Sequence, residues 1–305
     1  MNMFIHMPEQ SIAMIVPYVQ GGGSDQRARL AARHLETHLG EPVHVVNRTG
    51  AIAGHAAIAQ APADGKTIGL ITGEIGMMHW HEGLTALSPR DYTPLAVPFV
   101  ESAAVIVAAG SPWRTLHDLL DHCRALSVRG SGGPNFGVWK FALLGLLDRA
   151  GIDPGRLQWQ ETLSGEQGLE KVLAGDADIA PITMTDARGP LSTGRARALA
   201  TMEDTRHARF PDVPTVREAV GIDWQVAHWR GIVAPAGLPS HILDRYVAAL
   251  KAVAADAGFR AEAAASSFTL GWRFGDDFAR YMETDDRQFG RVIGLLGQKE
   301  KSCLH

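Results

Sequence analysis

The chain has 305 residues, of which 46% are hydrophobic and 20% are charged, and its formal net charge is −4. This length favours two domains or one large α/β domain, and the composition excludes a disordered chain. Because 33 acidic residues outnumber 29 basic ones and no long basic cluster is present, nucleic acid is not an expected partner. The longest purely apolar run, Ala103–Ala109, is too short to embed the protein in a membrane.

The N-terminal segment and the two cysteines bear on the cellular compartment. Met1–Gln10 has no Lys or Arg and no apolar run followed by a small-residue cleavage site, so it does not match a secretory signal. Either a signal is removed before this numbering begins or the protein stays in the cytoplasm. Cys123 and Cys303 are not expected to form a disulfide, because Cys303 lies in a Lys/Ser-rich C-terminal tail.

In chain order, short apolar runs alternate with segments of helical period, which is typical of βαβ units and mostly parallel sheets. The first unit is a strand at Ile12–Tyr18, a Gly21–Gly23 loop and a helix from about Asp25 to Leu39, which Gly40 ends. The other elements expected outside the second such unit are strands at Val43–Val46, Thr67–Ile71, Ile179–Ile182, Arg197–Thr201 and Trp224–Ala234, and helices at Ile52–Gln60, Ser240–Ala255 and Asp276–Leu296.

A second strand–glycine loop–helix unit lies past the middle of the chain. It comprises a short strand at Leu126–Arg129, the Gly130–Pro134 loop and a helix at Val138–Arg149. Two further helix starts are marked by capping boxes at Thr115–Asp118 and Thr215–Glu218. Two such units predict two similar lobes with a ligand cleft between them. Residues 1–104 with 227–305 would form the first, discontinuous lobe, and residues 105–226 the inserted second lobe.

The glycine loops are the best candidates for a binding site. A glycine-rich loop that leads into a helix gathers unpaired N–H donors at the positive end of the helix dipole. Gly21–Asp25 therefore suits a small anion such as a carboxylate. The alternative is that these glycines form only a strand-to-helix turn, with Ser24 or Asp25 as the N-cap. The matching Ser131–Asn135 loop favours the anion site, because two such helix ends can hold one ligand.

Common cofactor and catalytic motifs are absent. Gly21–Gln26 does not match G-x-G-x-x-G, and the Val43–Val46 strand is followed by Asn47 rather than an acid for a ribose. The phosphate-binding pattern G-x-x-x-x-G-K-[ST] is missing, and neither Ser24 nor Ser131 lies in G-x-S-x-G. The sequence therefore predicts no cofactor and no serine nucleophile of that type.

The 13 histidines raise the question of a metal site. His34 and His38 lie one helical turn apart, but the residues between them do not complete H-E-x-x-H, so we expect solvated surface positions. The His79–Glu82 segment holds two histidines and a carboxylate near a predicted strand end. We interpret it as loop or pocket lining, and no metal is predicted. Trp139, just after the second loop, is a candidate ligand contact.

Several segments together resemble one known family. Pro17–Arg29 matches P-[FY]-x-x-G-G-x-x-D-x-x-A-R, Asn47–Gly54 reads N-R-T-G-A-I-A-G, and Ala63–Thr67 reads A-D-G-K-T. Further matching segments follow in order at Arg197–Ala200, Pro211–Thr215 and Trp229–Pro239. Over nearly its whole length the chain resembles the extracytoplasmic solute receptors of the tripartite tricarboxylate transporters, the Bug or TctC family.

The resemblance implies a type II periplasmic-binding-protein fold, which is an α/β fold with two lobes around a ligand cleft. It implies a periplasmic location, a small mono- or dicarboxylate held largely by backbone amides and water, and partners among the membrane components of a tripartite transporter. The ligand-binding positions carried over from the family are Tyr18, Gly21, Gly22, Ser24, Asp25, Thr72 and Gly73 in the first lobe, and Ser131, Gly132, Asn135, Thr183 and Asp186 in the second.

The chain also departs from the family pattern. Pro134 replaces a usual glycine, Val138 replaces a common histidine, and Glu161–Leu163 stands where the family has Y-[KR]-G. An acid thus replaces a cationic or aromatic contact, which leaves the ligand preference open. The function predicted is a solute-binding receptor rather than an enzyme. The alternative is a cytoplasmic lyase, isomerase or hydrolase that acts on an organic acid with the same fold.

Ligand binding is expected to close the two lobes, with hinges near Ala103–Val107 and Trp224–Ala227. Asp25 is assigned to capping its own helix, because an acid beside a bound carboxylate would repel it. Asn caps about as well as Asp, so Asp25→Asn is expected to keep the affinity within a few-fold. Gly22→Val is expected to abolish binding, because it blocks the approach to the backbone.

Overall fold

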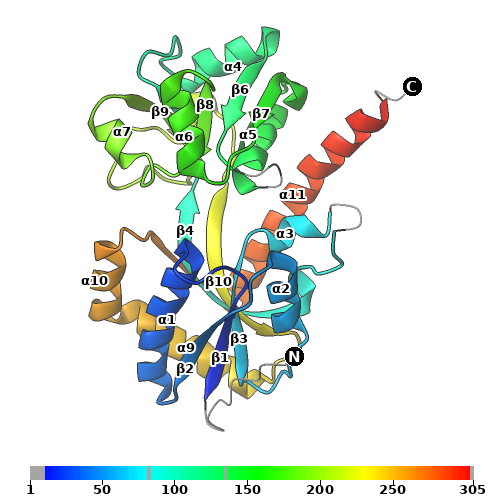
Figure 1. The fold of residues 1–305 in the computed structure, drawn as a ribbon, viewed down its shortest axis with the longest axis vertical. Helices are drawn as coiled ribbons and strands as arrows, with labels where there is room; N and C mark the ends of the chain where they lie inside the picture. Colours follow the sequence, from blue (N-terminus) through cyan, green and yellow to red (C-terminus); the bar gives the residue numbers. More distant parts are fainter. Residues whose placement is uncertain (1–10, 81–83, 134, 136, 303–305) are drawn as a thin grey trace. The chain divides into compact units, whose positions relative to one another are not determined.

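The computed structural model describes residues 11–80, 84–133, 135 and 137–302 (Figure 1). The chain divides into two compact units. Unit 1 consists of Met1–Val100 and Trp229–Arg287, and unit 2 of Glu101–His228 and Gln288–His305. Among the described helices, none is both long enough and apolar enough to cross a membrane.

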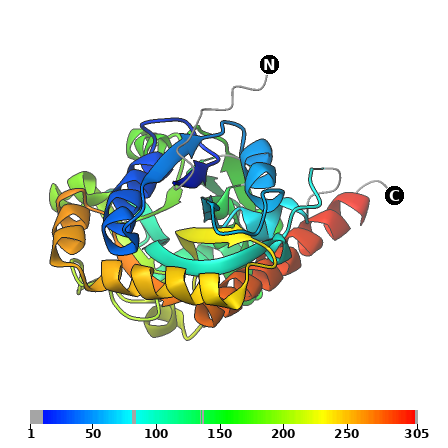
Figure 2. The same cartoon turned by 90° about the horizontal axis from the view of Figure 1, so that it is seen from below.

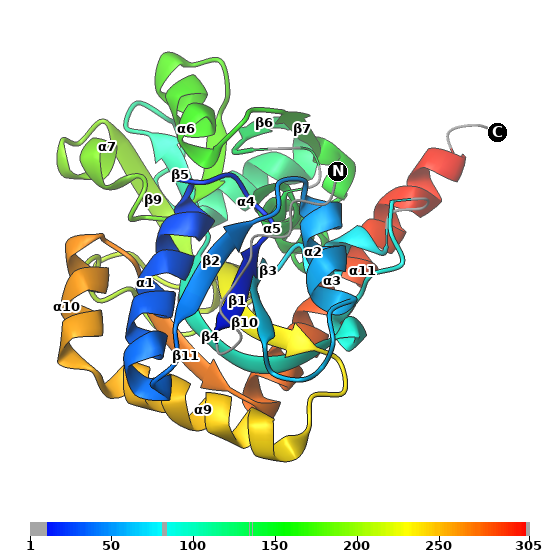
Figure 3. The same ribbon diagram turned by 60° about the horizontal axis from the view of Figure 1, so that its bottom comes forward.

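Unit 1 is built on a sheet of six strands, β1 (Ile12–Val16), β2 (Val43–Asn47), β3 (Thr67–Thr72), β4 (Tyr92–Ser102), β10 (Ala227–Pro235) and β11 (Leu270–Phe274). Their order is β11-β4-β10-β3-β1-β2 (Figure 3). β1 lies between β2 and β3 and is parallel to both, whereas β10 is antiparallel to β3 and β11 to β4. The carboxyl ends of β1, β2 and β3 therefore share one edge of the sheet.

The helical elements of unit 1 are α1 (Gly23–Leu39), α2 (Ala51–Ala59), α3 (Ile75–Met78), the short η1 (Pro89–Asp91), α9 (Ser240–Ala255), α10 (Ala257–Ala265) and the part of α11 (Asp276–Ser302) up to Arg287. On one face of the sheet lie α1, α9 and α10. The apolar side of α1, with Ala28, Ala32 and Leu35, is buried there against the strands. On the other face, Ile58 of α2 and Phe278 of α11 pack around Trp229. Figures 2 and 3 show the two helical layers of this unit.

Unit 2 has a five-stranded sheet with β5 (Ala104–Ala108), β6 (Val128–Ser131), β7 (Leu157–Gln160), β8 (Ile179–Ile182) and β9 (Ala196–Thr201). The order is β7-β6-β8-β5-β9, where β6 is parallel to β7 and β8, and β5 is antiparallel to β8 and β9. Its helical elements are α4 (Leu116–Ala125), α5 (Val138–Arg149), η2 (Pro154–Arg156), α6 (Gly165–Ala174), α7 (Arg188–Ser192) and α8 (Val216–Val220).

The α/β class predicted from the sequence is confirmed, but both sheets are mixed rather than mostly parallel. The sequence was assigned no element over β4 and none over β11, and β5 was noted only as the apolar run Ala103–Ala109. β4 and β11 run antiparallel to each other, and β5 runs antiparallel to β8 and β9. The predicted bounds of α5, α9 and β8 are those observed, whereas β6 begins two residues later than predicted, at Val128, and β10 three later, at Ala227.

The local signals for helix starts are confirmed. Thr115 Oγ1 accepts the N–H of Asp118, whose carboxylate accepts the N–H of Thr115, and Thr215 and Glu218 make the same reciprocal pair. Such boxes satisfy N–H groups that a helix end leaves without partners. Cys123 is buried and free, while Pro134 and Cys303 lie outside the described residues.

Candidate functional site

The candidate site of unit 1 lies where strands of its sheet end together. Tyr18 follows β1, Asn47 is the last residue of β2, and Thr72 is the last residue of β3. β10 runs in the opposite direction and places Arg230 beside Thr72 in the sheet register. Open α/β sheets bind ligands at the carboxyl ends of their parallel strands. The topology therefore brings these side chains to the edge where a ligand is expected.

The loop after β1 leads directly into the N-terminus of α1. Gly21 has a φ of 81°, a left-handed conformation that favours glycine. Gly22 is the N-cap of α1, and no side chain of the described residues caps this helix end. A Cβ on Gly22 would lie 3.2 Å from the carbonyl oxygen of Val19. The first-turn N–H groups are therefore left for an acceptor from outside, at the positive end of the helix dipole.

The prediction that Ser24 or Asp25 caps α1 is wrong. Asp25 lies in the first turn, almost fully buried, and its Oδ2 accepts hydrogen bonds from the Gly21 N–H (2.8 Å) and Arg29 Nε (2.9 Å). Its Oδ1 accepts from Asn47 Nδ2 (2.9 Å). Burial alone would raise the pKa of Asp25, but the bonds from Arg29, Gly21 and Asn47 together lower it. Asp25 thus fixes the loop from behind rather than capping the helix.

Two of the predicted site residues of unit 1, Tyr18 and Thr72, are in direct contact. Their hydroxyl oxygens lie 2.7 Å apart, and the Tyr18 hydroxyl donates to Glu74 Oε2 at 3.0 Å. Burial raises the pKa of the Glu74 carboxyl, although the bond from Tyr18, the charge of Arg230 and a bond from Thr72 oppose this. Sequence reasoning missed Glu74, because a single acid after a strand has no spacing that distinguishes it.

The segment that carries Thr72 and Glu74 is supported from behind by α11. A Cβ on Gly73 would lie 3.2 Å from Trp229 Nε1, and this indole nitrogen donates to Asp285 Oδ2 at 2.5 Å. Burial raises the pKa of Asp285 to about 7. Gly73 is therefore needed where the backbone passes close to the Trp229 ring, and Asp285 fixes that ring.

The histidines were considered from the sequence as possible metal ligands. No group of three His, Cys, Asp or Glu that could hold a metal occurs within the described ranges. His79 Nε2 lies 3.0 Å from Asp286 Oδ1, whereas His81 and Glu82 lie outside the described residues.

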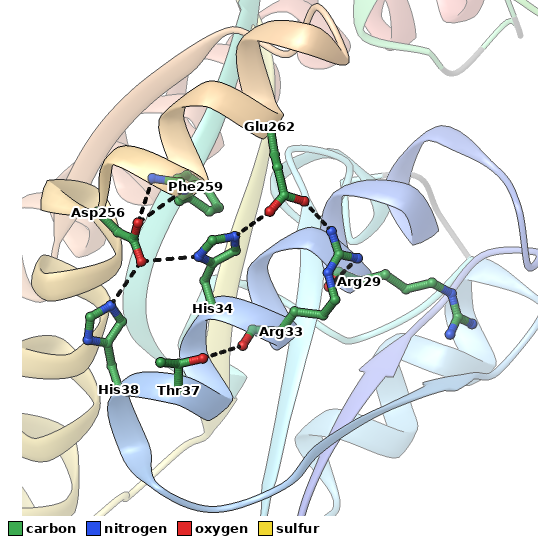
Figure 4. A network of polar contacts seen from close by, with 9 residues as sticks. Arg29, Arg33, His34, Thr37, His38, Asp256, Phe259 and Glu262 are labelled. Carbon is green, nitrogen blue, oxygen red and sulfur yellow. Dashed lines mark hydrogen bonds and ion pairs between the residues drawn. The ribbon is translucent and has the colours of Figure 1, made fainter.

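His34 is not the solvated surface residue expected from the sequence (Figure 4). Its side chain is only 14% exposed, with Nδ1 3.2 Å from Asp256 Oδ2 and Nε2 3.0 Å from Glu262 Oε1. His38 Nε2 lies 3.4 Å from the same Asp256 oxygen. These contacts join α1 to α10, a helix that was not predicted from the sequence. Side-chain hydrogen bonding from His34 contributes most to lowering the pKa of Asp256 to about 2.

In unit 2, Ser131 ends β6, Thr183 follows β8, and the two parallel strands end at the same edge. Ser131 is fully buried and its hydroxyl donates to the Gln160 carbonyl at 2.9 Å. A Cβ on Gly168 of α6 would lie 2.4 Å from Gly132 N. The start of this second loop is therefore packed tightly into the fold.

The second loop already carries a carboxylate of this chain. The Asn135 N–H lies 3.3 Å from Glu161 Oε1, and Asn135 Nδ2 lies 2.8 Å from Oε2. Lys140 Nζ lies 3.4 Å from Asn135 Oδ1. Glu161 is exposed, so both Asn135 donors point to an acid at the surface of unit 2. The acid that departs from the family pattern is thus placed directly at the predicted loop.

The remaining candidates of unit 2 bond to each other or to aromatic rings. Thr183 Oγ1 donates to Asp186 Oδ2 at 2.8 Å and accepts the Asp186 N–H at 2.9 Å. The Trp139 ring meets His228 edge-on, with 5.8 Å between the ring centroids. Thr183 and Asp186 therefore form a local turn at the end of β8.

The sequence of the chain is similar to that of a known receptor family and of two curated proteins. It matches the model of the tripartite tricarboxylate transporter family receptor, TctC, over residues 27–297. A UPF0065 protein from the tcbD–tcbE intergenic region of Pseudomonas sp. strain P51 is 30% identical over 81% of this chain and 75% of its own length. BugT of Bordetella pertussis is 28% identical over 84% of this chain and 81% of its own length.

Solved structures agree with this similarity. A TctC solute-binding protein from Polaromonas, solved without ligand, has a TM-score of 0.86 and 26% identity, covering 94% of this chain and 99% of that one. MatC of Rhodopseudomonas palustris with bound malate has a TM-score of 0.71 and 22% identity, over 94% and 100%. An R. palustris protein with adipate has a TM-score of 0.74 and 21% identity, over 95% and 98%. The last two likenesses concern the fold.

Proposed function

Because the chain belongs to the tripartite tricarboxylate transporter receptor family, we propose that it captures a small mono- or dicarboxylate in the periplasm for the membrane components of such a transporter. The observation that carries the ligand class is the uncapped N-terminus of α1 behind the Gly21–Gly22 loop. Its free N–H donors and helix dipole favour a carboxylate. Malate and adipate, bound by two proteins of similar fold, support this size and chemistry.

The proposed contacts remain those assigned from the family pattern. In unit 1 the backbone of the glycine loop would donate to the ligand, while Asp25 would hold that loop in place. In unit 2 the donors of Asn135 would become available when Glu161 moves away. The matched family is a receptor family, so no reaction is proposed. The full proposed set of site residues, in which Asp25 supports the loop, is Tyr18, Gly21, Gly22, Ser24, Asp25, Thr72, Gly73, Ser131, Gly132, Asn135, Thr183 and Asp186.

Thermal unfolding of the purified protein with added solutes tests this proposal. Malate, adipate and benzoate represent the proposed class, and glucose and putrescine serve as neutral and cationic controls. A ligand that binds only the folded state stabilises it by about 2.7 kcal/mol at 100 times its Kd. We expect a rise in Tm that grows with acid concentration, followed by a single-site calorimetric titration. Stabilisation by the sugar or the amine alone would contradict the proposal.

A further inference from the structure

Glu74 is a carboxylic acid that lies beside the proposed binding site for a ligand carboxylate. Its Oε2 accepts the Tyr18 hydroxyl at 3.0 Å, and Tyr18 Oη lies 2.7 Å from Thr72 Oγ1. Tyr18 and Thr72 are both proposed ligand contacts, and their hydroxyls are the donors that a carboxylate would use. Thr72 is 1% exposed, while Tyr18 and Glu74 are partly buried. The carboxyl therefore competes directly with a ligand for these two hydroxyl groups.

Counting the protons of this cluster shows what the competition requires. An ionised carboxylate can only accept hydrogen bonds, and each hydroxyl has one proton to donate. With Glu74 ionised, Tyr18 donates to Glu74, so the one Thr72 proton serves the contacts of Thr72 with Tyr18 and with Glu74. Both hydroxyl protons are then used inside the cluster. A neutral Glu74 adds a third proton. When this proton goes to Tyr18 and Tyr18 donates to Thr72, Thr72 no longer needs to donate to Glu74, and its proton is left to donate to a ligand.

The surroundings decide how readily Glu74 takes that proton. Burial raises its pKa, and the charge of Arg230, which pairs with Thr72 across β10 and β3, opposes the rise. The His55 ring of α2 meets the Tyr18 ring edge-on at 6.3 Å, and Asp285 of α11 bonds to Trp229. A ligand carboxylate brought to Tyr18 adds a second negative charge, which raises the pKa of Glu74 further.

We propose that Glu74 couples the binding of a carboxylate at Tyr18 and Thr72 to the uptake of one proton. The inference rests on the proposed function and adds its regulation. The proton comes from solvent and forms an O–H bond on the Glu74 carboxylate, and no other covalent bond changes. A neutral Glu74 then donates to Tyr18, and the hydroxyl chain ends on the ligand. Binding therefore tightens as the pH falls.

The linkage fixes the sign and the size of this effect. Where Glu74 is ionised in the free protein and neutral in the complex, the Kd rises about tenfold for each pH unit. Below the pKa of Glu74 in the free protein the Kd becomes independent of pH, because the proton is already present. Such a receptor holds its ligand most tightly in acidic surroundings and releases it more readily as the pH rises.

Calorimetric titrations with malate, adipate and benzoate, in buffers of different ionisation enthalpy, measure the protons taken up. The range from about pH 6 to about pH 9 keeps these acids ionised, because their carboxyl pKa values lie near 4 to 5. We expect up to one proton per ligand for the unchanged protein. Glu74→Gln is expected to take up none and to bind at least about tenfold tighter than the unchanged protein at about pH 9, because its amide donates to Tyr18 without a proton from solvent.

Two control variants separate Glu74 from other carboxyls. Glu203 of unit 2 has a pKa that burial raises to about 7, and it bonds to Thr201 at 3.3 Å. Glu203→Gln and Asp285→Asn should both retain the proton uptake. Uptake that persists in Glu74→Gln, or that disappears in Asp285→Asn alone, overturns the inference.

Tyr18→Phe supplies a second measurement if Glu74→Gln fails to fold. It removes the hydroxyl that links Glu74 to Thr72. Affinity should therefore fall mainly at low pH, where the hydroxyl chain of the unchanged protein donates a proton to the ligand. An equal loss at every pH contradicts the proton chain. A pH-independent Kd of the unchanged protein overturns this inference and leaves the carboxylate receptor intact, whereas no binding of any acid overturns both.

Discussion

The two glycine loops are alike in sequence, but carboxylates hold them in different ways. In unit 1, Asp25 comes from the first turn of the helix that the loop begins, is almost fully buried and accepts from Gly21. In unit 2, Glu161 follows a different strand, is exposed and faces Asn135. A buried carboxylate with several donors is part of the fold, whereas an exposed one can be exchanged for a ligand carboxylate. Asp25 therefore supports the first loop, whereas Glu161 would compete with a ligand carboxylate for the donors of Asn135.

The two loops nevertheless share one packing device. A glycine from a later helix lies against the backbone of each loop. A Cβ on Gly54 of α2 would come within 2.5 Å of Pro17 Cα, and one on Gly168 of α6 within 2.4 Å of Gly132 N. Neither helix could approach so closely with a larger residue. Both loops are therefore fixed by close backbone packing, and they differ in what the N–H donors face.

The largest effect is expected from closing the first loop with Gly22→Val. Its side chain would meet the Val19 carbonyl oxygen and cover the first turn of α1, so two or more hydrogen bonds to a carboxylate would be lost. We expect at least ~100-fold weaker binding by calorimetry. Gly110→Val is the control, because no atom lies within 4 Å of a Cβ there. Unchanged affinity in Gly22→Val would show that the ligand does not use this loop.

The next effect concerns the support of the first loop. Asp25→Ala removes the acceptor for Gly21, Arg29 and Asn47, and we expect a loss of about 2 kcal/mol in the free energy of unfolding. Because the pKa of Asp25 is lowered in the fold, its stabilisation is present above its unfolded pKa, about 4, and is lost as the pH falls through the folded pKa. Urea unfolding at several pH values should therefore show a smaller difference between the two proteins in acid.

A matched comparison uses the carboxylate of the second loop. Glu161→Ala is expected to change the free energy of unfolding by less than about 0.5 kcal/mol, because its side chain is exposed. Equal losses in Asp25→Ala and Glu161→Ala would contradict the distinction between the two loops.

Asp25 also shows where sequence reasoning reached its limit. From the sequence, Asp25→Asn looks harmless, since either residue caps a helix. The structure predicts otherwise, because an amide would replace one of two oxygens that face the donors of Gly21, Arg29 and Asn47. The motif fixed the position of Asp25 at the loop, but the direction of its side chain depends on β2, which is distant in sequence.

Other elements show the same division between local and distant information. The capping boxes at Thr115 and Thr215 were predictable, because both partners lie within one helical turn. The burial of His34 was not predictable. Its partners are Asp256, just before α10, and Glu262 in α10, and both are more than 200 residues away in sequence. Glu74 was missed for the same reason, because what distinguishes it is its hydrogen bond from Tyr18, which follows a different strand.

The shared packing of the two loops can be tested by adding one methyl group to the helix glycine that packs against each loop. Gly54→Ala and Gly168→Ala should each lower the free energy of unfolding by about 1 to 2 kcal/mol, because backbone atoms would have to move apart. Gly189→Ala in α7 is the control, since nothing lies within 4 Å of its Cβ, and alanine there should be neutral or stabilising. A loss confined to one of the two loops would break the packing similarity.

The smallest effect is expected at the second loop. Glu161→Gln removes a negative charge from beside Asn135 and makes the side chain a weaker acceptor for the Asn135 amide. A ligand carboxylate then meets less repulsion and less competition, so we expect about threefold tighter binding, the size of one exposed charge interaction. Glu166→Gln, an exposed acid in the first turn of α6, provides the matched control and should leave the Kd unchanged. Weaker binding in Glu161→Gln would instead mean that Glu161 holds Asn135 in place for the ligand, as Asp25 holds Gly21.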